Sequence, residues 1–293
     1  MKTLPLSVLF YEGPMARAYL EMISRAGFKV EAVIRMVPKP GMLARLLPRG
    51  MRGEMLAYRQ EKRANHWPRV LAGQFPALCQ EMTSKIEATL DLGEGFIAAL
   101  RSGRDLSEYG PVETIEVDNL KDPELVRALA AKSQHPVLFT GGGLLPPAVF
   151  EIDGLRLLHV HPGYLPDVRG ADGLLWSTLV RGRPGVSAFV MAPGLDEGDL
   201  LLAMETAPLQ FEIPPGEFPG DRDLYRMAYS YYDPVLRVYA LRQLLPSLEA
   251  GVAPTGTPQD TAVGRTYHFM QGRLRHSALA RLFRRTDDVL AAR

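Results

Sequence analysis

The sequence predicts an α/β protein with a Rossmann-like, mostly parallel sheet and helices on both faces. Short apolar, strand-like segments alternate with helical segments on either side of one interruption, which is typical of a parallel sheet. One apolar strand also ends in two histidines, at the position where open α/β sheets bind their ligands. We expect an α/β domain over residues 1–205, with a helical insertion at about 38–110, and a mainly helical C-terminal extension over 206–293.

A strand–helix–strand unit begins the chain. Residues 4–11 form an apolar run that predicts a buried strand, and residues 29–35 predict a second one. Between them, residues 14–26 predict a helix, because Pro14 lies near its first turn and Gly27 follows its end. This order is typical of two parallel strands joined by a helix.

The insertion at about 38–110 is poor in β-branched residues and rich in helix formers, so we expect several helices there. Part of it is basic. Either these residues form a solvated helical face, or they form a lid or an anion-binding surface beside the site. The basic residues in question are Arg45, Arg49, Arg52, Arg59, Lys62, Arg63 and Arg69.

Strand–helix alternation resumes after the insertion. Gly141, Gly142 and Gly143 follow a predicted strand; they either let the backbone approach a ligand closely or form a tight turn. Their spacing is not that of a dinucleotide-binding motif. The remaining expected elements are strands at 112–117, 136–140, 155–161, 185–191 and 200–207, helices at 122–132, 173–181, 221–250 and 276–293, a short helix from 144, and a loop with a short strand at 255–267.

The two histidines of the 155–161 strand are His159 and His161, directly before Pro162. Side chains alternate along a strand, so the two rings face the same way, roughly 7 Å apart. Three interpretations are open: an active-site pair, a structural pair, or, with a later Asp, a zinc or iron site. Asp196 lies in the segment Gly194-Leu195-Asp196-Glu197-Gly198, where it either caps a turn or holds a carboxylate in the site.

These segments together resemble the folate-dependent formyltransferase family, which includes enzymes acting on glycinamide ribonucleotide, methionyl-tRNA and sugars. The family has Asn-x-His-Pro at a strand end, a Leu-Pro turn, an Arg-Gly pair and a later Leu/Val-Asp-x-Gly segment. The resemblance covers roughly residues 110–205 well, and the family's Asn is His159 here. The matching pieces are His161-Pro162, Leu165-Pro166, Arg169-Gly170 and Leu195-Asp196-Glu197-Gly198.

The resemblance implies catalytic roles for three residues. His161 and Asp196 would handle the proton of the attacking amine, while His159 would replace an Asn that donates a hydrogen bond to the formyl oxygen. A histidine can donate that bond if its ring is cationic or neutral with the right tautomer. The resemblance also implies a folate-binding set, made of Gly141, Gly142, Gly143, Leu144, Leu195 and Glu197, and late Gln and Tyr residues similar to Gln259 and Tyr267.

From the resemblance we expect formyl transfer from 10-formyltetrahydrofolate to a small-molecule amine, such as an amino sugar or a hydroxyornithine-type amine. No metal is expected. The alternatives are a formyltetrahydrofolate hydrolase, a diverged enzyme or ligand-binding protein on the same fold, and a metal-dependent enzyme that uses His159, His161 and Asp196.

Composition narrows the class of partner. The net charge is +1 and the residues after Glu205 look mostly helical, so a nucleic-acid partner is not expected. No run of 18 apolar residues occurs, which argues against a membrane span. The lone cysteine, Cys79, fits a cytoplasmic protein, and a homodimer is compatible with the sequence.

Overall fold

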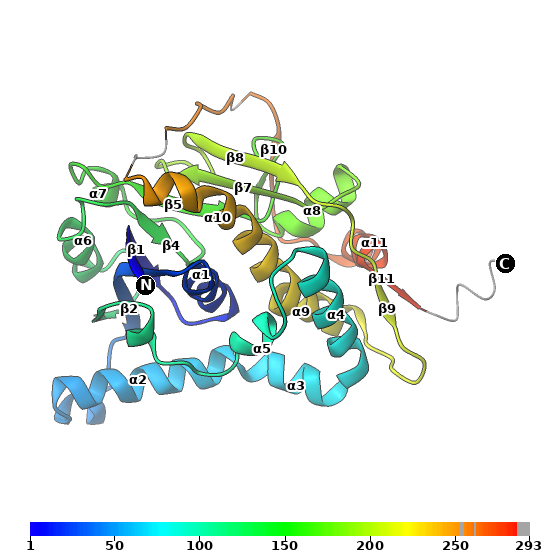
Figure 1. Cartoon of the computed structure of the whole chain (residues 1–293), viewed down its shortest axis with the longest axis horizontal. Helices are drawn as coiled ribbons and strands as arrows, with labels where there is room; N and C mark the ends of the chain where they lie inside the picture. The colour runs from blue at the N-terminus through cyan, green and yellow to red at the C-terminus, as the bar shows by residue number, and fades with distance from the viewer. Residues whose placement is uncertain (252–254, 261, 286–293) are drawn as a thin grey trace.

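The computed structural model describes residues 1–251, 255–260 and 262–285 (Figure 1). A seven-stranded sheet in the order β3-β2-β1-β4-β5-β7-β8 forms its centre. The first five strands in this order are parallel, and β7 pairs antiparallel with both of its neighbours. The sheet confirms the predicted α/β fold. The strands are β1 (Lys2–Phe10), β2 (Phe28–Pro38), β3 (Val112–Val117), β4 (Val137–Phe139), β5 (Leu157–His161), β7 (Gly185–Val190) and β8 (Leu200–Glu205).

Helices cover both faces of the sheet, as predicted. The larger hydrophobic core lies under α1 (Pro14–Arg25) and α10 (Asp233–Glu249). A second core lies under α6 (Pro123–Ala130) and α7 (Pro147–Phe150). Leu158 and Val160 of β5 belong to the first core and Leu157 to the second, because successive side chains of a strand point to opposite faces.

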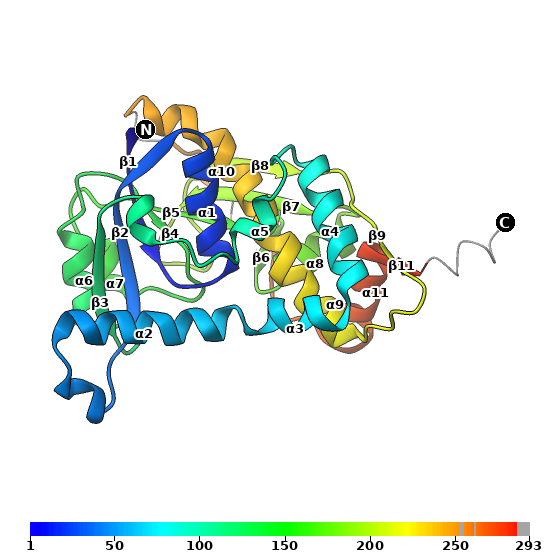
Figure 2. The same cartoon turned by 60° about the horizontal axis from the view of Figure 1, so that its bottom comes forward.

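The insertion is helical, as predicted. Its long helix α2 runs past the carboxyl ends of β2 and β3, and the chain then turns into α3 and α4 (Figure 2). These last two helices pack against α9 and β9 of the C-terminal extension. The elements of the insertion are η1 (Leu43–Leu46), α2 (Arg49–Ala64), α3 (His66–Gln74), α4 (Pro76–Thr89), α5 (Phe96–Ala99) and η2 (Leu106–Glu108).

The helical pattern predicted over 221–250 is present, with a π-helical turn in its middle. It comprises α9 (Asp221–Met227), the π turn η3 (Ala228–Tyr232) and α10. Together α10 and α1 cover the first face of the sheet. No helix of the described part is both long and apolar enough to cross a membrane.

Within the described residues, the basic helix predicted over 276–293 is wrong in where it begins and in its continuation after Leu282. Helix α11 (Gly272–Leu282) begins earlier and is followed at once by strand β11 (Phe283–Arg285). That strand pairs with β9 (Phe211–Ile213), and the centroids of the Phe283 and Phe211 rings lie 5.5 Å apart. Long-range pairing thus overrides the local helical tendency. Residues 286–293 lie outside the described part of the chain.

Two more short strands were not predicted. They are β9 and β6 (Val168–Gly170), each only three residues long. The predicted short strand near residue 267 is β10 (Arg265–Tyr267), and it pairs with β6 in a small parallel sheet. Such short strands leave no periodic pattern in the sequence, because three residues are too few to show alternation. The β6–β10 pair lies next to the predicted site.

Candidate active site

His161 is the last residue of β5 and is buried, with 3% of its surface exposed. Its Nε2 lies 3.0 Å from the carbonyl oxygen of Val168 in β6. A carbonyl oxygen only accepts, so Nε2 carries the proton and donates it. The other ring nitrogen, Nδ1, lies 3.4 Å from Asp196 Oδ2. Nδ1 is therefore the atom at which His161 gains or loses its second proton.

Two glycines make room for this ring. A Cβ atom at Gly163 would lie 2.5 Å from His161 Nε2 and 2.7 Å from the Val168 carbonyl oxygen. A Cβ atom at Gly173, the first residue of α8 (Gly173–Val180), would lie 2.9 Å from the same nitrogen. These distances are shorter than a Cβ atom normally keeps from other atoms. The turn after β5 and the start of α8 therefore need glycine to close around the imidazole.

Asp196 both caps a backbone group and faces His161. It lies in the loop between β7 and β8 and has a left-handed backbone, with φ of 52°. Its Oδ2 accepts a hydrogen bond of 2.7 Å from the Gly170 N–H of β6. The same oxygen approaches His161 Nδ1, so the two interpretations of Asp196, turn cap and site carboxylate, describe one geometry.

Gln259 fastens the Asp196 loop from the C-terminal side. Its Nε2 donates to the carbonyl oxygens of Asp196, at 3.1 Å, and Gly198, at 2.8 Å. Tyr267, the other late residue implied by the resemblance, belongs to β10 and stacks on Trp176 with ring centroids 4.4 Å apart. Both residues thus support the segments that surround His161.

The surroundings of His161 act on its pKa in opposite directions, and the net effect lowers it. Burial lowers the pKa of His161, and the carboxylate of Asp196 acts in the opposite direction. Arg237 of α10, whose guanidinium donates to the Val160 carbonyl oxygen, lowers the pKa further. This arginine was missed by the sequence analysis, because nothing in its local pattern separates it from a surface residue of the same helix.

His159 lies two residues before His161 in β5, and 8% of its surface is exposed. Its ring lies between the rings of Phe139 and Phe189. Its Nδ1 lies 3.1 Å from the Phe139 carbonyl oxygen and so carries the ring proton. Burial, aided by the charge of Arg237, lowers the pKa of His159 to about 4. At neutral pH the ring is therefore neutral, and Nε2 has a lone pair and no proton. Donation from Nε2, as expected from the family's Asn, requires the cation that burial opposes.

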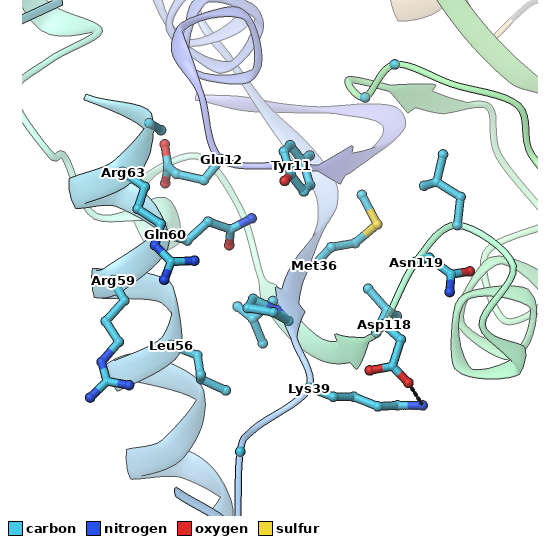
Figure 3. A pocket seen from close by; sticks show the side chains of 18 residues that line it. Tyr11, Glu12, Met36, Lys39, Leu56, Arg59, Gln60, Arg63, Asp118 and Asn119 are labelled. Atoms are coloured by element: carbon cyan, nitrogen blue, oxygen red, sulfur yellow. Dashed lines mark ion pairs between the residues drawn. The ribbon is translucent and has the colours of Figure 1, made fainter. Parts of the chain in front are cut away.

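The glycine loop and the Asp196 loop do not line the same cavity. Gly141 and Gly142 line a cavity of about 870 Å³ that opens between α2 and the carboxyl ends of β1, β2 and β3 (Figure 3). Neither His161 nor Asp196 lines it, although the resemblance places residues of both loops in one folate-binding set. The loop still adjoins the site, because His159 bonds to Phe139 only two residues before Gly141.

The other predicted folate-binding residues occupy different surroundings. Leu144 and Leu195 are exposed, at 58% and 40%. Gly143 has a left-handed backbone, with φ of 105°, directly before Leu144. Glu197 is half-buried beside Gly194 in the Asp196 loop. The set therefore divides between two loops, one after β4 and one between β7 and β8.

Among the described residues, no group of three or more His, Cys, Asp or Glu side chains is placed to hold a metal ion. His159 and His161 each direct one ring nitrogen at a backbone carbonyl. That arrangement leaves one nitrogen of each ring for another partner.

Fold and site together define an α/β protein with a histidine–carboxylate pair at the carboxyl edge of its sheet. No family model matches the chain. A methionyl-tRNA formyltransferase of Syntrophus aciditrophicus is 33% identical over 153 residues, which cover 51% of this chain and 45% of that relative. One of Clostridioides difficile is 29% identical over 170 residues, covering 56% and 48%. The chain therefore spans about half the length of these curated relatives.

Among solved structures, a 4-N formyltransferase from Francisella tularensis aligns with 96% of this chain and 87% of its own, at 9% identity and a TM-score of 0.47. A formyltransferase from Anoxybacillus kamchatkensis, solved with tetrahydrofolate, covers 56% of this chain and 77% of its own, at 20% identity and a TM-score of 0.37. By sequence, about half of the chain is similar to methionyl-tRNA formyltransferases.

Proposed function

We propose that the protein transfers a formyl group from 10-formyltetrahydrofolate to an amine of a small-molecule metabolite. One observation carries the proposal: a buried His161 held against Asp196 at the carboxyl end of β5, in a chain related to formyltransferases. The relatives matched by sequence are methionyl-tRNA formyltransferases, so the donor chemistry has the stronger support and the acceptor needs its own argument.

Proton handling follows from the hydrogen bonds of the site. The amine nitrogen attacks the formyl carbon, the bond from that carbon to the folate nitrogen breaks, and the proton lost by the amine ends on the folate nitrogen. His161 has one nitrogen committed to Val168, so it acts through Nδ1 and Asp196. The unprotonated Nε2 of His159 is a further proton acceptor at the same strand end.

A small-molecule acceptor is favoured over tRNA by two features of this chain. The net charge of +1 supplies no basic excess for a nucleic-acid backbone. The described segment after β8 consists mainly of α9, α10 and α11, which pack against other helices and the sheet, with three strands of three residues each. An amino sugar or a hydroxyornithine-type amine is therefore the proposed acceptor class.

Two measurements test the proposal. Calorimetry with 5-formyltetrahydrofolate should show saturable binding; no heat at millimolar ligand would contradict a folate site. Release of tetrahydrofolate from 10-formyltetrahydrofolate should then depend on an added amine. Release in water at the same rate, with or without amines, would instead support the hydrolase.

A further inference from the structure

The cavity beside α2 has an apolar wall and a basic side. Its wall on the sheet is formed by buried side chains of β2 and β3, including Met36, Val37 and Val117. Opposite them, Figure 3 shows Gln60 and Arg63 on α2 near Tyr11 and Glu12 of the loop after β1. A cavity of about 870 Å³ is within the range of small-molecule sites.

The acidic groups that line this cavity already have cationic partners. Glu12 forms a buried ion pair with Arg17, at 2.8 Å, and Arg17 itself lies outside the lining. Asp118 pairs with Lys39 at 3.2 Å, as the dashed line in Figure 3 marks. Glu12 is thus neutralised by Arg17, whereas Asp118 shares Lys39 with Asp122, which lies 2.6 Å from the same nitrogen. The other cationic side chains of the lining are two arginines.

Those arginines are Arg59 and Arg63, four residues apart and so on the same side of α2. Neither forms an ion pair or a side-chain hydrogen bond with any residue that the structure describes. Two other arginines of the insertion are engaged elsewhere. Arg52 pairs with Glu116 at 2.7 Å, and Arg45 donates to the Pro40 carbonyl oxygen at 3.3 Å.

From this geometry we propose that Arg59 and Arg63 bind an anionic group, a phosphate or diphosphate ester, of the acceptor amine. Guanidinium groups bind phosphate oxygens with charge-assisted, often bidentate hydrogen bonds. The apolar wall of β2 and β3 accommodates the uncharged body of the same molecule. The inference rests on the proposed formyl transfer, because it assigns the cavity to the acceptor of that reaction.

The position of the cavity suits an acceptor. Gly141 and Gly142 line its end nearest the site, and Tyr11 N–H donates to Thr140 Oγ1, which ties the loop after β1 to this glycine loop. A molecule held at its anionic end by α2 would extend its amine along the glycine loop toward β5. The glutamate carboxylates of a folate are the other source of an anion, and the experiment below separates the two.

Binding of inorganic pyrophosphate to the full chain, measured by calorimetry, tests the proposal directly. We expect saturable binding that Arg59→Gln and Arg63→Gln each weaken by about tenfold, the change expected for one lost charge-assisted hydrogen bond. Arg69→Gln is the matched control: Arg69 is exposed, lies in the next helix and does not line the cavity. It should bind pyrophosphate like the wild type.

The same variants titrated with 5-formyltetrahydrofolate identify the source of the anion. Unchanged folate binding in Arg59→Gln and Arg63→Gln supports the acceptor. Weakened folate binding with unchanged pyrophosphate binding overturns the proposal in favour of the folate tail. Absence of pyrophosphate binding, or equal binding by all variants, also overturns it. Arginine-dependent pyrophosphate binding without any formyl transfer would preserve the anion site and contradict the proposed function instead.

Discussion

Asp196 shows how one residue can support both a loop and a proton transfer. Its left-handed backbone turns the carboxylate toward His161, while the Gly170 N–H holds one of its oxygens. The neighbouring Gln259 bonds to backbone carbonyls of the same loop, so the carboxylate does not depend on His161 for its position. A change in its charge should therefore affect chemistry more than folding.

Replacing Asp196 with Asn should lower turnover by roughly a hundredfold or more, the scale of lost acid–base assistance. The amide oxygen can still accept from Gly170, so the thermal midpoint should change little. Asp199→Asn is the control, because Asp199 is exposed in the same loop. Steady-state release of tetrahydrofolate measures the effect; near-wild-type turnover would reduce Asp196 to a turn residue.

Two variants of His159 distinguish a proton acceptor from a hydrogen-bond donor at this position. If its neutral Nε2 accepts a proton, His159→Asn should lose turnover about as fully as His159→Ala, since an amide nitrogen is not a base. If His159 instead donates to the formyl oxygen, Asn should keep substantial transfer, while Ala should lose roughly 10²–10³. Turnover of both variants with wild-type His159 as reference decides between the modes.

Acid should destabilise the protein through His159. Its pKa is about 4 in the folded chain and near 6.5 when unfolded, so below pH 6.5 the unfolded chain takes up a proton that the folded chain refuses. Stability is thus lost as pH falls from 6.5 to about 4, by roughly 3 kcal/mol for this group.

Urea unfolding of His159→Asn at pH 7 and pH 4.5 should show a smaller acid loss than the wild type. The control is His135→Asn, because His135 is exposed and its removal should leave the acid loss unchanged. Equal acid losses in all three proteins would contradict a buried, neutral His159.

Backbone atoms of the surrounding segments lie directly against the His161 ring. The turn after β5, strand β6 and the start of α8 close on the His161 ring, and the glycines at 163 and 173 permit this approach. The loop between β7 and β8 is fixed from the other side by Gln259. The position of the His161 ring therefore depends on the close approach of these segments, which glycine at 163 and 173 permits.

Gly163→Ala should disturb this closure. Its Cβ would lie 2.5 Å from His161 Nε2, so the ring or the backbone must move, at a cost of about 1–3 kcal/mol in the free energy of unfolding. Gly73→Ala in α3 is the control: no atom lies within 4 Å of its Cβ, and alanine there should stabilise by about 0.5–1 kcal/mol. Urea unfolding compares them; a Gly163→Ala protein as stable as wild type would contradict the tight fit.

In the whole molecule, the C-terminal extension contributes to the environment of the site. Helix α10 packs on the sheet, and its Arg237 donates to the carbonyl oxygen of Val160, the residue between His159 and His161. Arg237 also pairs with Asp233 at 3.0 Å, with both side chains almost fully buried. A charge on α10 thereby influences the protonation of both histidines.

Arg237→Leu should destabilise the protein by about 3–5 kcal/mol, because it leaves the Asp233 carboxylate buried without a partner. The double variant with Asp233→Leu should recover a large part of that loss, since neither charge then remains. Chemical unfolding of the two single variants and the double variant provides the cycle. If the double variant is as unstable as the sum of the single ones, the two residues are not coupled.

Much of the architecture could be predicted from local patterns. Six of the seven strands of the sheet span five or more residues, and the insertion is rich in helix formers, so these segments carry their own signal. The strands β6, β9 and β11 were not predicted, because each pairs with a segment distant in the sequence and no local pattern encodes that pairing. For the same reason the chain after Leu282 pairs as a strand where a helix was expected.

At the site, local alternation along β5 is enough to place His159 and His161 on one face of the strand. The partner of each ring nitrogen follows only from the packing of distant segments. Val168, Asp196 and Phe139 lie at distances along the chain that no periodicity encodes. The same packing places Arg59 and Arg63 in the lining of a cavity, while Arg52 pairs with Glu116. Buried polar groups must find partners, and those partners are chosen by the packing of distant segments.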